Sequence, residues 1–389
     1  MSSLRGRVAI VGAADTALGR VPEKDATQLC VEAALRALAD AGLRKDQVDG
    51  LVTCNSMSQP RMYHAEAIAE YLQIFPRYCV SANAGGGTTF SVIAQAAAAI
   101  EAGLCETVVV SMADSLRSGL SRAQAMVTQS SSGHPEFETP YGASVPGYYA
   151  LIAQAYLHEF GATPEQFAAV AVTCRAHAAL HPHAQMREPI TVADVLASRL
   201  IADPLRLLDC SLVSDGGAAI VLTSAERARD FPHTPVILLG AGEAHGHEHI
   251  SQARSLTSSF AKFSGERAYA MAGIGPSDVD IAYLYDCFTP VVLIELEDLG
   301  FCKPGEAGAF VAEGHARIGG RLPINTHGGL LSHCHPGNPG SMFAITEAVA
   351  QLRRAAGARQ VAGAELALLH AQGGILSSHA TLVLARGGA

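Results

Sequence analysis

The sequence predicts an α/β fold built from two similar halves. Strands that are apolar throughout alternate with helices along the chain, which is typical of sheets covered by helices on both faces. A unit of helix, glycine, polar turn and apolar strand occurs twice, at residues 37–49 and 268–280. A helix over residues 94–100 has a small-residue face, which suits a central layer shared by the two halves. We therefore expect an internal duplication.

The two copies of this unit match at six positions with one fixed offset. The residues are Ala37, Ala39, Ala41, Gly42, Val48 and Asp49 in the first copy, and Ala268, Ala270, Ala272, Gly273, Val279 and Asp280 in the second. They span a helix and the glycine that stops it, and they lead into strands predicted at 50–54 and 281–285. A coincidence between two ordinary helix–turn–strand units is the alternative explanation.

The remaining elements of the first half follow in order. An apolar strand is predicted at 8–12, and a short strand at 78–80 leads into a glycine turn. A small-residue helix at 87–103 and a strand at 107–111 come next.

The second half has matching elements. A helix is predicted at 340–354, a strand at 366–370 and a final strand at 380–384. Glycine and phenylalanine have the same spacing at the start of the 340–354 helix and of the 87–103 helix, which supports the duplication.

A region from about 115 to 205 differs from both halves. It contains a Ser/Gln/Gly stretch at 129–133 and an amphipathic helix at 148–158. Insertions of this kind commonly cover a functional site. We expect an N-terminal half over residues 1–250, which includes this insertion, and a C-terminal half over residues 251–389.

Composition and charge exclude several classes of function. The chain of 389 residues is 49% apolar and 16% charged, and its net charge of −9 comes without a basic stretch that would bind nucleic acid. It contains neither an apolar run as long as a membrane span nor the apolar region of a signal peptide. The nine cysteines are therefore expected to be reduced thiols. We expect a cytoplasmic protein that binds neither nucleic acid nor membrane.

The segment from Asn325 to Gly337, NTHGGLLSHCHPG, contains an Asn-x-x-Gly-Gly pattern followed six residues later by His-Pro. Five further segments accompany it, and they begin at Asn83, Ala178, Ser214, Tyr285 and Gly373. In this order they resemble the thiolases, above all the sterol-carrier or lipid-transfer branch, over nearly the whole chain. The resemblance implies the thiolase fold, in which two duplicated halves form a five-layer α-β-α-β-α core with an inserted loop region.

The position of the thiolase nucleophile is altered in this chain. In the family, an Asn-Cys-x-x-Gly motif places a cysteine at a helix N-terminus, where the thiolate is favoured and attacks the acyl carbon. Aligned on Gly87, that position is Ala84, and a shift of one residue gives Gly85. The usual nucleophile is missing, although an engineered replacement of the cysteine would give the same sequence. The turn can still offer N–H groups, including that of Ala84, to a carbonyl oxygen.

His335 matches the family histidine that acts on the thioester, and it can move protons or hydrogen-bond an enolate oxygen. The alternative is an exposed loop histidine before a proline. His333 is expected at the surface. Cys334 is expected to be a small buried residue, or alternatively a displaced nucleophile. The resemblance places Asn325 among the substrate-binding residues.

Tyr285 stands where the sterol-carrier branch has the histidine of a His-Asp-Cys-Phe motif. A tyrosine can donate to a carbonyl or, as a phenolate, accept a hydroxyl proton. This Tyr-Asp-x-Phe variant resembles the lipid-transfer-type aldolases that shorten steroid side chains and release a ketone from a β-hydroxyacyl-CoA. The alternative is an aromatic residue that only packs at a strand end. Asp286 could tie down the loop.

The last loop lacks the second catalytic cysteine of ordinary thiolases, because Gln372-Gly373-Gly374 occupies the place of Cys-x-Gly. Gly374 matches the glycine whose N–H helps to form an oxyanion hole. His379 could also enter the site, although it most simply begins the final strand.

Two groups of histidines could in principle chelate zinc: His245, His247 and His249, and His177, His181 and His183. Neither group is accompanied by cysteine pairs, so we expect solvated loop histidines and no metal site.

The resemblance implies an enzyme that breaks or forms a carbon–carbon bond in an acyl-CoA, with the CoA thioester as substrate and no covalently bound cofactor. Without a nucleophilic cysteine, retro-aldol cleavage of a β-hydroxyacyl-CoA is favoured. The alternatives are a thiolase or acyltransferase that uses Cys334 or Cys287, and a non-catalytic acyl-CoA- or lipid-binding subunit. The resemblance also implies a homodimer, and it leaves room for a small zinc-ribbon/OB-fold partner subunit.

Overall fold

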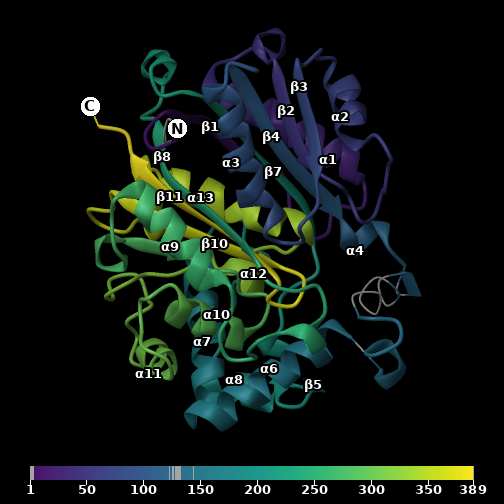
Figure 1. The fold of residues 1–389 in the computed structure, drawn as a ribbon, viewed down its shortest axis with the longest axis vertical. Helices are drawn as coiled ribbons and strands as arrows, with labels where there is room; N and C mark the ends of the chain where they lie inside the picture. The colour runs from purple at the N-terminus through teal and green to yellow at the C-terminus, as the bar shows by residue number, and fades with distance from the viewer. Residues whose placement is uncertain (1–3, 122, 125–126, 128–132, 143, 389) are drawn as a thin grey trace.

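The structure is a computed structural model that describes residues 4–121, 123–124, 127, 133–142 and 144–388. Most of the Ser/Gln/Gly stretch predicted at 129–133 lies outside these residues. Within the described chain, nine strands form one sheet in the order β3-β2-β4-β7-β1-β8-β11-β10-β9 (Figure 1). Antiparallel pairing of β1 with β8 joins the strands of the two halves.

The first half contributes strands β1 (Val8–Asp15), β2 (Gly50–Cys54), β3 (Tyr78–Ala82), β4 (Thr107–Ser115) and β7 (Asp215–Ser224), and helices α1 (Ala26–Ala41), α2 (His64–Leu72), α3 (Thr88–Glu101) and α4 (Leu116–Gly119). Strands β3, β2 and β4 are parallel, whereas β7 runs antiparallel to both β4 and β1. The predicted strands and the small-residue helix of this half are confirmed.

The second half contributes strands β8 (Val236–His245), β9 (Ile281–Tyr283), β10 (Leu366–Gly373) and β11 (Ser378–Arg386), and helices α9 (Ala261–Ala272), α10 (Thr289–Asp298), α11 (Ala307–Ala312), α12 (Gly329–Ser332) and α13 (Met342–Leu352). The predicted strand at 281–285 ends early, at Tyr283. The reason is tertiary, because the Leu284 N–H donates to the Asn325 side chain at 2.8 Å. This grouping starts the second half at β8, before the boundary near residue 250 that the sequence predicted, and the position of that boundary remains a prediction.

The duplication is confirmed by two equivalent aspartates. Helices α1 and α9 both end at a glycine in the left-handed region, Gly42 at φ +69° and Gly273 at φ +68°. In each copy the aspartate that follows receives N–H groups where a neighbouring strand begins. Asp49 accepts from Thr107 at 2.8 Å, and Asp280 accepts from Leu366 at 2.9 Å. The matched aspartates therefore make the same contact in the two halves.

Alternation of side chains along the strands produces the layers. In β4, Val108 and Val110 belong to the core that the two halves share, whereas Val109 packs into the separate core under α1. Helices α3 and α13 form the central layer, because each contacts strands of both halves. Helix α1 covers the other face of the first half, and α9 covers β8 and β11 (Figure 1). The expected layered thiolase fold is confirmed.

The inserted region supplies helices α6 (Val145–Phe160), α7 (Pro164–Leu180) and α8 (Val192–Ala197), and the two-stranded sheet of β5 (Leu200–Ala202) and β6 (Leu205–Arg206). Although it follows β4 of the first half, α7 packs against α10, α11 and α12 of the second half. Figure 1 shows these helices gathered at the end of the molecule away from β2 and β3. The insertion therefore packs against the helices of the second half that follow the Tyr285 turn and form part of the histidine loop.

The expectation of surface-exposed histidines is partly wrong. His333 is 1% exposed, and its ring lies edge-on to His181 at 4.5 Å and to His327 at 5.1 Å between centroids. His177 and His181 are also buried, whereas His183 and His245 are exposed. Burial arises because α12 packs on α7, a contact between segments far apart in the sequence. Burial also lowers the pKa of His333, so the ring is neutral.

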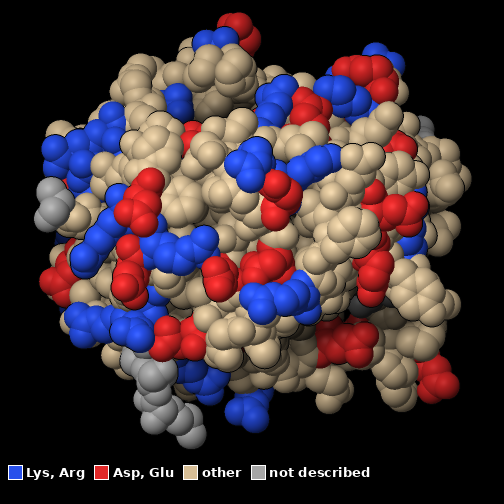
Figure 2. All heavy atoms as spheres, turned by 90° about the horizontal axis from the view of Figure 1, so that it is seen from above, with Lys and Arg blue, Asp and Glu red and all other residues tan. Residues whose placement is uncertain are grey.

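None of the described helices is long and apolar enough to cross a bilayer. Side chains of both charges are interspersed on the face seen in Figure 2.

Candidate active site

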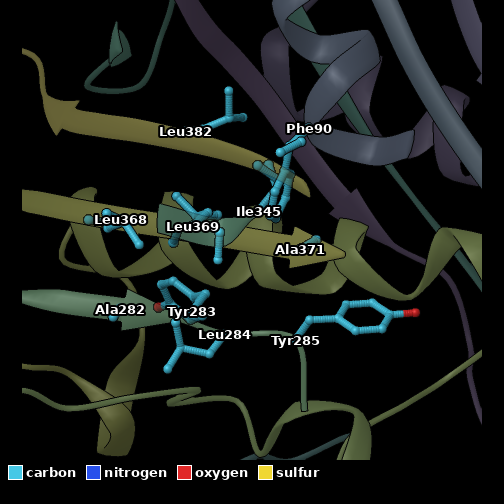
Figure 3. Packing of buried hydrophobic residues seen from close by; sticks show 14 of the residues in the cluster. Phe90, Ala282, Tyr283, Leu284, Tyr285, Ile345, Leu368, Leu369, Ala371 and Leu382 are labelled. Carbon is cyan, nitrogen blue, oxygen red and sulfur yellow. The ribbon is translucent and has the colours of Figure 1, made fainter. Parts of the chain in front are cut away.

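Tyr285 follows the end of β9 by two residues and belongs to the buried core that the two halves share. Figure 3 shows its ring pointing away from Tyr283 and Leu284, which pack among buried aliphatic side chains. Its backbone N–H donates to Glu295 Oε2 at 2.8 Å, so a buried carboxyl group on α10 holds this turn. The phenol ring is thus presented from a fixed backbone position.

His335 meets the Tyr285 hydroxyl. The distance from Tyr285 Oη to His335 Nε2 is 3.4 Å, and the rings are perpendicular, with an interplanar angle of 87°. On its other side, His335 Nδ1 lies 2.9 Å from Ser211 Oγ, and the His335 backbone N–H donates to Ser214 Oγ at 3.0 Å. Ser211 therefore orients the imidazole toward the tyrosine, and Ser214 holds the backbone of the same residue.

Burial sets the protonation of this pair. It lowers the pKa of His335 to about 4 and raises the pKa of Tyr285 well above its usual value. At neutral pH the imidazole is uncharged and the tyrosine keeps its proton, so a free phenolate is disfavoured. When Nδ1–H donates to Ser211, the lone pair of Nε2 faces the Tyr285 hydroxyl.

The glycine-rich turn before α3 lies directly against Tyr285. A Cβ added to Gly86 would overlap the tyrosine ring, so only glycine fits there. Ser341 donates to the Gly86 carbonyl at 3.0 Å. The Ala84 N–H already donates to Thr88 Oγ1 at 2.7 Å. The threonine therefore occupies the Ala84 N–H in this structure, and a role of that N–H in holding a substrate oxygen stays a prediction that this contact opposes.

The last loop stacks on the same turn, backbone against backbone. A Cβ on Gly85 would lie 2.9 Å from the Gly374 nitrogen, and a Cβ on Gly373 would overlap the Ala84 carbonyl oxygen. Gly374 has φ +64°, in the left-handed region that glycine favours. The structure thus brings Ala84, Tyr285, His335 and Gly374 together, although they come from four separate segments.

Asn325 has a structural role in this arrangement. It is 1% exposed, and its side chain pairs with the Leu284 backbone: Oδ1 accepts from the Leu284 N–H at 2.8 Å, and Nδ2 donates to the Leu284 carbonyl at 3.0 Å. Asp286 accepts the N–H groups of Leu330 at 2.8 Å and Leu331 at 3.2 Å. Both side chains hold the histidine loop against the tyrosine turn. Asp286 thus fixes the loop, as the sequence predicted.

His379 lies in β11 and is fully buried, with Nδ1 3.2 Å from His370 Nε2. It begins the final strand, as its simplest interpretation predicted, and it does not join the Tyr285–His335 pair among the contacts of the described residues. His370 in turn lies 3.8 Å from Glu295. The side chains of His370 and Glu295 therefore lie between His379 and the tyrosine turn.

The two cysteines considered as alternative nucleophiles are buried. Cys334 is 1% exposed and Cys287 is 5% exposed, and burial raises the pKa of both thiols. A buried neutral thiol is a poor nucleophile. Among the residues that the structure describes, no three His, Cys, Asp or Glu side chains are grouped so that they could hold a metal ion.

Sequence reasoning did not assign roles to Ser211, Thr88, Glu295 or Tyr149, all of which hold site residues. Thr88 and Glu295 lie in motif segments that were recognised, whereas Ser211 and Tyr149 carry no local signal. Their roles depend on contacts that the fold creates.

Comparison with known proteins agrees with this geometry. A family model described as the thiolase N-terminal domain matches residues 8–226, and one described as thiolase C-terminal domain-like matches residues 242–386. A thiolase core with alanine at position 84, in which a tyrosine packs on the neighbouring glycine turn and meets a histidine, defines a thiolase-like protein. The chain belongs to the thiolase family.

Two of its relatives are named for carbon–carbon cleavage. The chain is 41% identical to a steroid side-chain-cleaving aldolase of Thermomonospora curvata, over 91% of this chain and 92% of the relative. It is 39% identical to a 17-hydroxy-3-oxo-4-pregnene-20-carboxyl-CoA lyase of Mycobacterium tuberculosis, over 96% and 98% of the two chains. Among solved structures, the Ltp2-ChsH2(DUF35) aldolase matches with a TM-score of 0.89 and 38% identity over 99% of both chains.

Proposed function

We propose that this chain is a thiolase-like acyl-CoA lyase that cleaves a β-hydroxyacyl-CoA by a noncovalent retro-aldol reaction. The observation that carries the proposal is the contact of 3.4 Å between the Tyr285 hydroxyl and His335 Nε2, beside the turn where Ala84 replaces the nucleophile. The names of the aldolase and lyase relatives support the same reaction class.

Proton transfer in this reaction uses the tyrosine–histidine pair. The Tyr285 oxygen accepts the β-hydroxyl proton while its own proton passes to His335 Nε2, so no free phenolate has to exist beforehand. The Cα–Cβ bond then breaks and the β-carbon becomes the carbonyl carbon of a ketone or aldehyde. The electrons of the broken bond form the thioester enolate. Transfer of the proton held by His335 to Cα gives the shortened acyl-CoA and restores the neutral imidazole, so the reaction consumes neither water nor an oxidant.

The enolate oxygen needs hydrogen-bond donors that are in place before the bond breaks, because preorganised donors stabilise developing charge most effectively. The Gly374 N–H is assigned this task. The Ala84 N–H is not, since Thr88 occupies it. His335, once protonated, is a second donor within the same site.

The alternatives are weaker on physical grounds. A thiolase or acyltransferase mechanism needs an accessible thiolate, but the Cys334 and Cys287 thiols are buried and their pKa values are raised. A non-catalytic acyl-CoA-binding subunit has no need for a tyrosine hydroxyl aligned with a neutral imidazole that Ser211 orients.

Incubation with acetyl-CoA or acetoacetyl-CoA is expected to leave the protein without an acetyl adduct. The reason is that Ala84 has no nucleophilic atom and the nearby thiols are neutral. Intact-mass spectrometry after acid quenching measures this directly, with a cysteine-dependent thiolase as the positive control. A stoichiometric adduct on any cysteine would rule out the noncovalent mechanism.

We also propose that the chain forms a homodimer and binds a small zinc-ribbon/OB-fold subunit that helps to hold the CoA substrate. The support is the solved Ltp2-ChsH2(DUF35) aldolase, whose name includes a DUF35 component. Purified alone, the chain is expected to have twice its monomer mass by native mass spectrometry, and a larger mass after co-expression with a DUF35 protein from the same genome. A monomer at micromolar concentration would contradict the dimer, and failure to co-purify would contradict the partner.

A further inference from the structure

We propose that Tyr149, from the inserted region, is a positioning residue that fixes the Gly373–Gly374 loop for enolate stabilisation, and that Gln372 holds Tyr149 in the required orientation. This inference rests on the proposed function and extends it to two residues outside the Tyr285–His335 pair.

Tyr149 connects the insertion to the last loop. It lies on α6 and is 2% exposed, and its hydroxyl is 3.1 Å from the Gly374 carbonyl oxygen, to which it donates. Its ring stacks on Phe288 with 4.5 Å between centroids and an interplanar angle of 24°. Phe288 follows the Tyr285 turn by three residues, so the same ring contacts both segments that build the site.

Gln372 determines the direction of the Tyr149 hydrogen bond. Gln372 Nε2 donates to the Tyr149 hydroxyl at 2.5 Å, and Gln372 Oε1 accepts the Leu376 N–H at 3.1 Å. An amide NH2 can only donate, so the tyrosine oxygen acts as acceptor there and its single proton is left for the Gly374 carbonyl. Burial raises the pKa of Tyr149, which keeps that proton in place.

The two peptide groups that flank Gly374 are fixed by these contacts. The Gly373 carbonyl accepts the Ser377 N–H at 3.1 Å, and the Gly374 carbonyl accepts the Tyr149 hydroxyl. Gly374 lies at φ +64°, and a glycine has more backbone freedom than any other residue. The Gly374 N–H shares a planar peptide group with the Gly373 carbonyl, which Ser377 holds. The tyrosine holds the peptide group on the other side of Gly374, so rotation about both backbone torsions of this glycine is restricted before the substrate arrives, as an oxyanion donor requires.

Gln372 stands at a position that has a different chemical role in the thiolases that this chain resembles. Its segment occupies the place of the second catalytic cysteine of ordinary thiolases. Here the Gln372 side chain forms hydrogen bonds with the Tyr149 hydroxyl and the Leu376 N–H, and its Nε2 lies 3.4 Å from Cys287 Sγ. A group with an acid/base role in thiolases is thus replaced by one that has no titratable proton and acts only through other residues.

The test compares Tyr149→Phe with Tyr156→Phe, a matched control on the same helix. Tyr156 is also fully buried, but its hydroxyl donates to Glu297 Oε1 at 2.5 Å, away from Gly374. The readouts are kcat and KM for cleavage, and exchange of the Cα hydrogen of the product acyl-CoA with deuterium oxide, which reports enolate formation without carbon–carbon cleavage.

Tyr149→Phe is expected to lower kcat and the exchange rate about tenfold while KM changes by less than about twofold, because oriented donors act on the transition state more than on bound substrate. Tyr156→Phe is expected to lower thermal stability and leave both rates of the folded enzyme unchanged. Equal losses of rate in the two variants, or no loss in Tyr149→Phe, would overturn the inference.

Gln372→Met is the second variant, because methionine keeps the length of glutamine and removes its hydrogen bonds. It is expected to reduce exchange in the same way, and the double variant should lose less than the product of the two single losses. Strictly multiplicative losses would mean that the two residues do not form one unit. A wild-type protein that neither cleaves nor exchanges would instead refute the proposed function. If Tyr149→Phe does not fold, the comparison of Gln372→Met with Tyr156→Phe decides the question.

Discussion

Replacing Tyr285 by phenylalanine is expected to reduce cleavage of a β-hydroxyacyl-CoA by about a hundredfold or more, the usual scale for an acid/base group. The change removes the hydroxyl that faces His335 and keeps the ring, so packing against the glycine turn survives. His335→Ala should cause a loss of similar size, because it removes the acceptor of the tyrosine proton. Steady-state kinetics on an authenticated substrate measures both.

The double variant is expected to lose less than the product of the two single losses, since both groups serve one proton transfer. Tyr283→Phe is the matched control, because Tyr283 is a buried tyrosine on the preceding strand whose hydroxyl lies 3.0 Å from Thr326 Oγ1 in the core. It should lose stability and retain the turnover of the folded enzyme. Full turnover in both Tyr285→Phe and His335→Ala would show that these residues are structural and would favour the binding-subunit alternative.

Gly86→Ala is expected to reduce cleavage by about a hundredfold through displacement of the Tyr285 ring. The new methyl group would overlap that ring, and a misplacement of about 1 Å at a reacting group can cost this much rate. The same overpacking should lower the free energy of unfolding by about 1–3 kcal/mol. Kinetics and urea denaturation of the purified variant separate the two effects.

Gly275→Ala provides the control for a glycine with space around it. Its φ is −120°, and an added Cβ would meet only the Asp278 carboxylate, at 3.9 Å. This variant should match the wild-type protein in rate and stability. If Gly86→Ala cleaves as fast as Gly275→Ala, the tyrosine ring does not need its observed position.

The sequence determined the order of elements and the duplication because both are local. Glycines stop α1 and α9 in the same way, and Asp49 and Asp280 tie the next strands through neighbouring backbone groups. The absence of a nucleophile at Ala84 is also a property of the sequence alone. The grouping of Ala84, Tyr285, His335 and Gly374 was predictable only through the family resemblance, since their spacing carries no such information.

Only the tertiary structure decided what each group can do with a proton. The pKa values of Tyr285 and His335 depend on burial, and the hydrogen bond between them joins residues 50 positions apart. Packing of α12 on α7 placed His333 in the interior, again through segments far apart in the sequence. Tyr149 reaches Gly374 across 225 positions. Desolvation and hydrogen-bond direction are set by neighbours in space, and a linear sequence does not specify those neighbours without the fold.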